Sequence, residues 1–169
     1  MNLHKLVVQQ PAKMLRNVQA WLRKAQSYAE ERKFDVNNLL SARLAPDQYP
    51  LVRQIQTACD GAKLNAARLS GKEPPVHPDT ETTVEQLMAR VDSVVAFLET
   101  IGPSDFEGAL DRKITTNWMQ GKHMVGGDYL CEFVVPNFYF HISHIYALLR
   151  HNGVPLGKFD YIGGANLKD

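Results

Sequence analysis

The chain has 169 residues, of which 44% are hydrophobic and 22% are charged, a composition typical of a globular domain with a single core. Its 19 Lys and Arg residues nearly balance 18 Asp and Glu residues, so it lacks the basic excess of a nucleic-acid-binding protein. With no secretory signal, no CxxC pair and no run of roughly 20 apolar residues, the sequence predicts one cytoplasmic domain over residues 1–169, with neither nucleic acid nor a membrane as a partner.

From residue 11 to residue 32, apolar residues recur at steps of three and four, which predicts a long amphipathic helix. Pro11 suits the first turn of this helix, where a missing backbone donor costs little. A second helix is expected to begin after Asp47, a favourable N-cap, and to end at Gly71. The segment KEPPVHPD that follows contains three prolines and is expected to be a loop.

A third helix is expected from about residue 82 to residue 101. Thr82 and Glu85 stand at capping-box spacing before the most regular apolar stripe of the chain, and Gly102 with Pro103 ends the helix. The three helices have similar lengths and short connections, which favour antiparallel neighbours in a bundle.

Residues 104–127 break the helical pattern, and we expect a small hairpin or ordered loop there. Residues 114–119 have an extended pattern, and residues 120–122 allow a turn. A fourth helix is expected over residues 128–152, with Pro136 either kinking it or marking its start and Gly153 as its left-handed cap. The tail that contains FDYIGG is expected to pack back across the bundle.

Two runs of the sequence are distinctive. They are PLVRQIQTACDGAKLNAARLSG at residues 50–71 and PNFYFHISHIYALLRHNGVPLGKFDYIG at residues 136–163. Both resemble an uncharacterised bacterial family within the DinB-like, YfiT-like group of metalloenzymes. The resemblance implies an all-α, DinB-like four-helix bundle, often dimeric. In several members of that group a divalent metal is bound by one histidine on the second helix and two on the last, and some members are thiol-dependent transferases.

The histidine pattern of this chain departs from that group. Residues 50–70 contain no histidine, and residue 145, one turn beyond His141, is isoleucine. On the helical wheel His141 lies roughly 80° from the centre of the apolar stripe and leans inward, whereas His144 lies roughly 140° away and faces solvent or a neighbouring chain. A metal site would use His141 and His144 with a third ligand from Asp60, Glu132, Asp128 or His123, and would hold zinc, nickel or manganese. The alternative is that these histidines are structural or lie on the surface.

The same helices carry other candidate side chains with a structural and a functional interpretation. Asp60 pairs with Arg53 and Arg150 to lock helices together, or it helps to bind a metal. Cys59 lies close to the apolar stripe of its helix, which predicts a buried, unreactive thiol. Six aromatic residues either line an apolar ligand pocket or belong to the core: Trp118, Phe133, Phe138, Tyr139, Phe140 and Tyr146.

Three functions are therefore compatible with the sequence. The first is a DinB-like helical bundle that binds a small molecule or has a degenerate metal site. The second is a divalent-metal-dependent enzyme of the thiol-transferase kind, in which the ion acidifies a bound water or thiol. The third is an interaction module that forms a homodimer through an apolar helix face.

Overall fold

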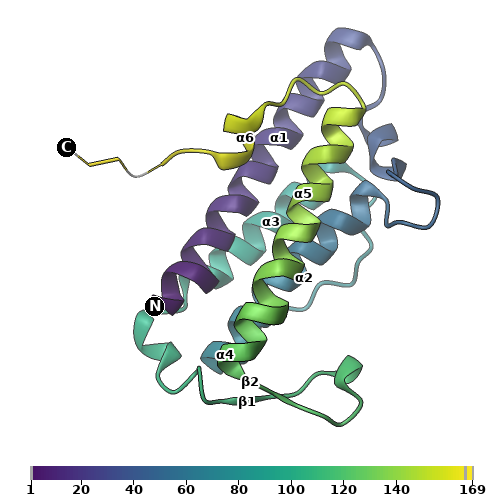
Figure 1. Cartoon of the computed structure of the whole chain (residues 1–169). Coiled ribbons are helices and arrows are strands. Elements are labelled where there is room, and N and C mark those ends of the chain that lie inside the picture. Colours follow the sequence, from purple (N-terminus) through teal and green to yellow (C-terminus); the bar gives the residue numbers. More distant parts are fainter. Residues whose placement is uncertain (1, 166, 169) are drawn as a thin grey trace.

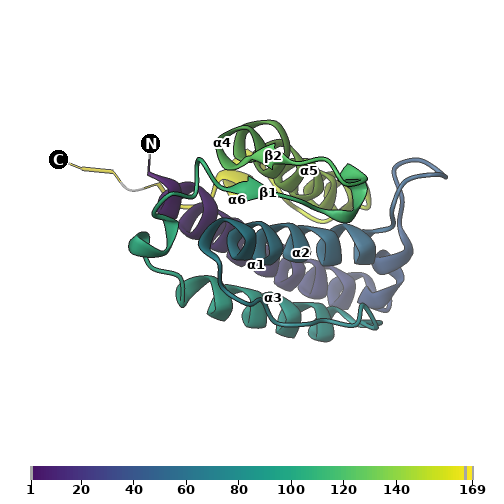
Figure 2. The same ribbon diagram turned by 90° about the horizontal axis from the view of Figure 1, so that it is seen from below.

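The computed structural model describes residues 2–165, 167 and 168, and its architecture is a bundle of four long helices (Figure 1). The helices are α1 (Gln10–Arg32), α2 (Leu51–Ser70), α3 (Val84–Glu99) and α5 (Val135–His151). α1 and α2 each pack against both α3 and α5, as the view from below in Figure 2 shows. The expected all-α bundle with an extended insertion before the last helix is confirmed. Within the described residues, no helix is long and apolar enough to cross a membrane.

The first three helices were expected to be antiparallel neighbours, and this expectation is wrong for α2 and α3; α1 and α5, which also pack together, are parallel as well. α1 and α5 run one way, and α2 and α3 run the other (Figure 1). A parallel pair requires the connection between α2 and α3 to return along the whole bundle. α2 has 20 residues and spans about 30 Å, whereas residues 72–83, when extended, reach about 40 Å at about 3.3 Å per residue. The proline-rich loop is therefore long enough to make the return.

Two π-helical turns accommodate prolines inside long helical runs. η1 (Lys5–Gln9) lies just before Pro11, and η5 (Tyr129–Val134) lies just before Pro136. A proline ring clashes with the carbonyl four residues earlier, and a widened turn relieves that clash. The first helical run thus begins at residue 3 rather than at Pro11, and the last runs without interruption from α4 (Gly126–Asp128) through η5 into α5.

Two helix starts differ from the prediction by one to a few residues. α2 begins at Leu51 with Pro50 as its N-cap, not directly after Asp47. The capping box of α3 is formed by Thr83 and Gln86, one residue later than the predicted pair. A tertiary contact accompanies this start of α3. The Val84 amide donates to Asn37 Oδ1 at 2.9 Å, and Asn37 belongs to the 3-10 helix η2 (Val36–Ser41).

The expected hairpin is present between α3 and α4. After the 3-10 helix η3 (Pro103–Phe106), β1 (Lys113–Ile114) pairs antiparallel with β2 (Met124–Val125), and η4 (Asn117–Met119) lies between them. Gly126 follows β2 directly and approaches the preceding chain so closely that a Cβ atom there would lie 1.9 Å from the Ala109 carbonyl oxygen. Only glycine permits this contact, which ties the hairpin to the start of the last helical run.

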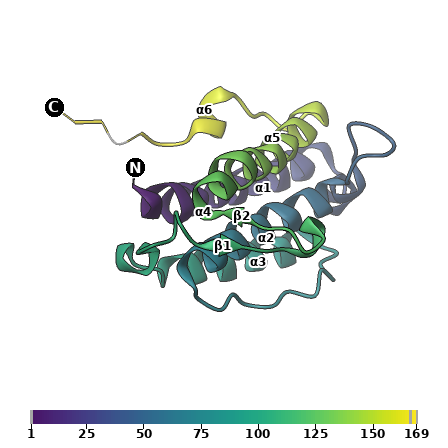
Figure 3. The ribbon, with the colours of Figure 1, turned by 60° about the horizontal axis from the view of Figure 1, so that its bottom comes forward.

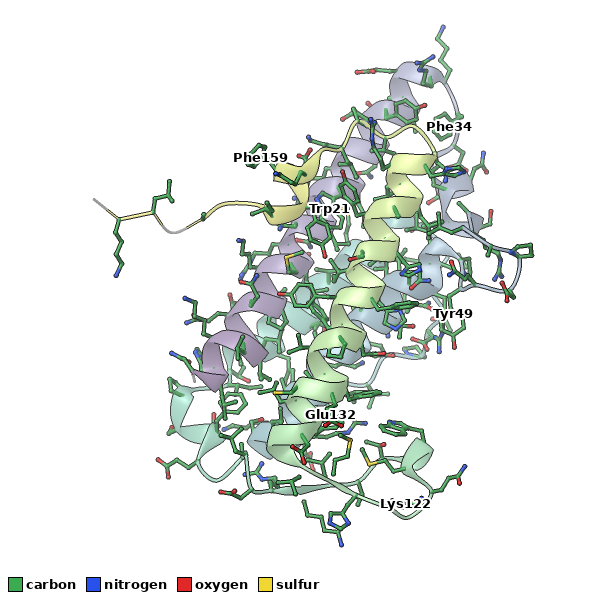
Figure 4. All side chains as sticks on the ribbon, in the orientation of Figure 1. Trp21, Phe34, Tyr49, Lys122, Glu132 and Phe159 are labelled. Carbon is green, nitrogen blue, oxygen red and sulfur yellow. The ribbon has the colours of Figure 1, made fainter. Side chains whose placement is uncertain are left out.

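The C-terminal segment packs back onto the bundle, as expected. α6 (Lys158–Ile162) lies beside α1 in Figure 1. The Trp21 indole donates to the carbonyl of Asp160 at 2.9 Å, and its ring stacks on Tyr161 with the ring centres 5.7 Å apart. In the stick view of Figure 4, Phe159 points away from α1, and it is 79% exposed. One aromatic residue of the tail therefore covers the bundle and the other does not.

Candidate functional site

His141 lies inside the bundle, where its position on the helical wheel placed it, with 6% of its surface exposed. Its Nδ1 lies 2.7 Å from Gln54 Oε1 of α2, and Gln54 Nε2 donates to the carbonyl of Tyr49. Because a Gln oxygen only accepts, the imidazole donates through Nδ1 and keeps a lone pair on Nε2. Burial, with a smaller contribution from His144, lowers the pKa of His141 to about 4. His141 is therefore neutral at physiological pH.

The other two predicted metal ligands, His144 and Asp60, are engaged by other groups. His144 Nδ1 donates to the carbonyl of Phe140 at 2.7 Å, while Asp60 Oδ1 accepts from two cationic side chains. Across residues 2–165, 167 and 168, no group of three or more His, Cys, Asp or Glu residues is arranged to hold a metal ion. One oriented imidazole does not fit a catalytic metal site, which uses about three protein ligands.

An ion network that the sequence analysis missed joins α2, α3 and the loop between them. Arg90 is buried, with 1% of its side chain exposed; it binds Asp60 at 2.7 Å, Asp79 at 2.6 Å and Glu81 at 3.0 Å. Lys63 adds a second cation, 2.9 Å from Asp60. Burial lowers the pKa of Arg90, but hydrogen bonds with Glu81 and Asp79 outweigh it, so this pKa is raised. The network fastens the returning loop to both helices.

The predicted partners of Asp60 were wrong. Arg53 pairs with Asp79 instead, and Arg150 forms no salt bridge with any described residue. The true partner, Arg90, occupies a position inside the apolar stripe of α3. A charged residue in such a stripe signals a buried ion pair, because an unpaired buried charge is strongly unfavourable.

The two cysteines differ in accessibility. Cys59 is 0% exposed, which confirms the expected buried thiol, and burial raises its pKa to about 12. Cys131 is exposed. Because the thiolate is the reactive form, Cys59 is unreactive in the folded protein.

A cavity of about 190 Å³ lies between α2, the η5–α5 run and the segment over residues 113–125. Figure 3 shows that segment alongside α2 and α4. In Figure 4, Glu132 lies near the start of the last helical run and Lys122 at the far turn of the segment. Ten residues line the cavity: Thr57, Asp60, Gly61, Leu64, Asn65, Arg68, Thr116, Trp118, Phe133 and Asn137. The walls combine aromatic surface with several polar groups.

Two polar atoms of this lining are buried and have no hydrogen-bond partner among the described residues: Asn65 Nδ2 and Thr116 Oγ1. The orientation of the Asn65 amide is fixed, since its oxygen accepts from the Tyr129 hydroxyl at 2.6 Å and from Arg68 at 3.3 Å. A buried polar group without a partner is costly and calls for a specific explanation. Both residues line the same cavity.

Arg68 gives this wall a positive charge. Its Nη1 donates to the Tyr129 hydroxyl at 3.1 Å as well as to Asn65. It forms no salt bridge within the described part of the chain, whereas the Asp60 carboxylate, which also lines the cavity, is paired with Arg90 and Lys63. The uncompensated charge at the cavity is therefore that of Arg68.

The six aromatic residues that the sequence singled out have different surroundings. Trp118 and Phe133 line the cavity and stack, with ring centres 5.0 Å apart. Phe138 belongs to the hydrophobic core, and Tyr139 packs against that core. Tyr146 packs on Trp21 and Tyr161, and Phe140 is 52% exposed. Two of the six residues therefore line a cavity, three pack in or against the core, and Phe140 lies on the surface.

Comparisons with known proteins agree with the fold. No curated protein matches the chain. A solved structure described as a DinB family member protein from Shewanella denitrificans is 44% identical and superposes with a TM-score of 0.95, covering 99% of this chain and 95% of that one. The model of the family described as "Domain of unknown function (DUF1993)" matches residues 3–162. The chain is therefore a member of this uncharacterised, DinB-like family, DUF1993.

Proposed function

We propose that the protein binds a small organic molecule in the cavity between α2, η5 and residues 113–125. The observation that carries the proposal is that two residues lining this cavity, Asn65 and Thr116, each have a buried polar atom, Nδ2 and Oγ1, with no hydrogen-bond partner among the described residues. Apolar and aromatic walls with a few placed polar groups are typical of ligand sites. Here the polar groups come from two elements that are distant in sequence, so a ligand would bridge the bundle and the hairpin.

The test is native mass spectrometry of untagged protein, followed by thermal-shift screening with single-ring compounds. Trp118 is 54% exposed on the short helix η4, so Trp118→Ala removes cavity wall without opening the core. Phe159→Ala is the matched control, because it deletes an exposed aromatic ring on α6, which does not line the cavity. We expect bound mass or thermal stabilisation that Trp118→Ala abolishes and Phe159→Ala retains. Equal loss in both variants, or no bound compound in any form, would contradict the proposal.

A divalent-metal-dependent enzyme is the competing function. The free lone pair on His141 Nε2 is compatible with it, but one imidazole without further ligands does not support it. Elemental analysis of protein purified without a chelator decides between the two. About one divalent ion per chain, lost in His141→Ala, would replace ligand binding with metal chemistry as the better account.

Homodimer formation stays a prediction. An apolar interface would keep the dimer together at high salt, since added salt screens charges and strengthens apolar burial. Sedimentation velocity at low and high salt measures this directly, and dissociation at high salt would rule out the apolar helix face.

A further inference from the structure

We propose that the ligand is a small aromatic carboxylate, with its ring on Trp118 and its carboxylate at Arg68 and Asn65. The inference rests on the proposed binding function and adds the chemical class of the ligand. Three properties of the cavity lead to it: its size, its aromatic wall and its unbalanced positive charge.

The volume of the cavity matches a ligand portion of one ring. The cavity measures about 190 Å³, and an engineered apolar cavity of about 150 Å³ holds benzene. The difference leaves room for a small substituent, and the cavity is open to solvent.

The aromatic wall favours a planar ring. Trp118, Phe133 and Tyr129 form a stack, with ring centres 5.0 Å and 5.5 Å apart and interplanar angles of 26° and 15°. Trp118 ends this stack and is 54% exposed. A ligand ring in the cavity would pack against Trp118 and Phe133, which both line it, and aromatic contacts of this kind are favourable beyond simple burial.

The polar end of the cavity favours an anion. Arg68 contributes a guanidinium that is held by Tyr129 and Asn65 but paired with no carboxylate of the described residues. Asn65, which lines the same cavity, has an Nδ2 donor without a partner among the described residues. A carboxylate only accepts hydrogen bonds and matches the fork of a guanidinium, so it satisfies both groups at once.

Asp60 is the one carboxylate in the cavity wall, and it is already neutralised. Its Oδ1 lies 2.7 Å from Arg90 and 2.9 Å from Lys63. Of the two charged residues that line the cavity, Asp60 is paired with Arg90 and Lys63, whereas Arg68 forms no salt bridge within the described part of the chain. The surplus is positive, which disfavours a cationic ligand and favours an anionic one.

The test is isothermal titration of the full chain with four probes: benzoate, benzamide, benzylamine and cyclohexanecarboxylate. We expect benzoate to bind best. Benzamide lacks the charge and should bind about tenfold more weakly, and cyclohexanecarboxylate lacks the planar ring and should bind about threefold more weakly. Arg68→Met should weaken benzoate binding by about tenfold or more, and Arg68→Lys should restore part of the loss.

Arg23→Met is the control for net charge, since Arg23 is exposed on α1 and does not line the cavity. It should leave benzoate binding unchanged. Benzamide or benzylamine binding as tightly as benzoate in the unmodified protein would overturn the carboxylate assignment but would keep the proposed binding function. If none of the four probes binds saturably, the assignment fails whatever the variants do. The proposed function then fails separately if the Trp118-dependent screen also finds no ligand.

Discussion

Gly61 is a helix-interior glycine whose replacement should separate stability from binding. It lies within α2 and lines the cavity. A Cβ atom there would meet Asn137 Nδ2 at 3.7 Å, an ordinary van der Waals distance. Alanine in a helix interior is favoured over glycine by about 1 kcal/mol. In a domain of this size that gain raises Tm by about 2–4 °C. The added methyl group also occupies part of the cavity, so Gly61→Ala should be more stable and bind benzoate more weakly.

Gly71→Ala provides the matched comparison on the same helix. Gly71 caps α2 with a φ of 80°, a left-handed conformation that costs an L-residue about 1–2 kcal/mol. Thermal unfolding followed by circular dichroism should therefore shift in opposite directions for the two variants, and titration should show weaker benzoate binding only for Gly61→Ala. A Gly61→Ala protein that is destabilised, or that binds benzoate as tightly as the unmodified chain, would refute this reasoning.

Three further predictions concern the groups around the cavity. Burial lowers the pKa of His141 from 6.5 to about 4, so the unfolded chain binds a proton first, and the free energy of unfolding should fall by about 3 kcal/mol as the pH drops from above 6.5 to about 4; urea unfolding should show a shallower pH dependence for His141→Gln, and an identical dependence would contradict the burial argument. Arg90→Met should lower the unfolding free energy by about 3–5 kcal/mol, whereas Arg16→Met, at an exposed position, should lower it by less than about 1 kcal/mol. Equal losses of unfolding free energy in the two variants would mean that the ion network does not hold α2, α3 and the loop together. Cys131 should react with a thiol reagent in the folded protein, and Cys59 should react only on unfolding. Mass mapping of the labelled peptides measures this, and labelling of Cys59 before Cys131 would contradict the prediction.

The helical stripes of the sequence predicted the four helices well, because burial of one apolar face dominates helix position in a bundle. The residues at which the helices begin were predicted less accurately. Whether Pro11 begins a helix or follows a π turn depends on whether the preceding residues are buried, and Val7 and Val8 are. The direction of α3 was missed for a similar reason: a loop rich in proline is compatible with a tight turn or with an extended return, and the ion pairs at Asp79 and Glu81 that anchor the return are tertiary.

The candidate site was predictable only in part. Helical geometry identified His141 as inward-facing and Cys59 as buried, because each lies on one helix whose wheel can be drawn. The cavity combines residues of α2, the last helical run and the hairpin, and no local pattern reveals that Asn65 and Thr116 are neighbours. Trp118 was singled out as aromatic, but its role depends on how residues 113–125 fold over α2.

The most direct test of the binding site uses the two tryptophans of the chain as reporters. Trp118 lines the cavity, whereas the indole of Trp21 is held by Asp160 under α6. In nitrogen–proton correlation spectra recorded during a benzoate titration, the Trp118 indole signal should move saturably and the Trp21 signal should stay in place. A Trp118 signal that does not move, or a Trp21 signal that moves alone, would contradict the assignment of this cavity as the ligand site.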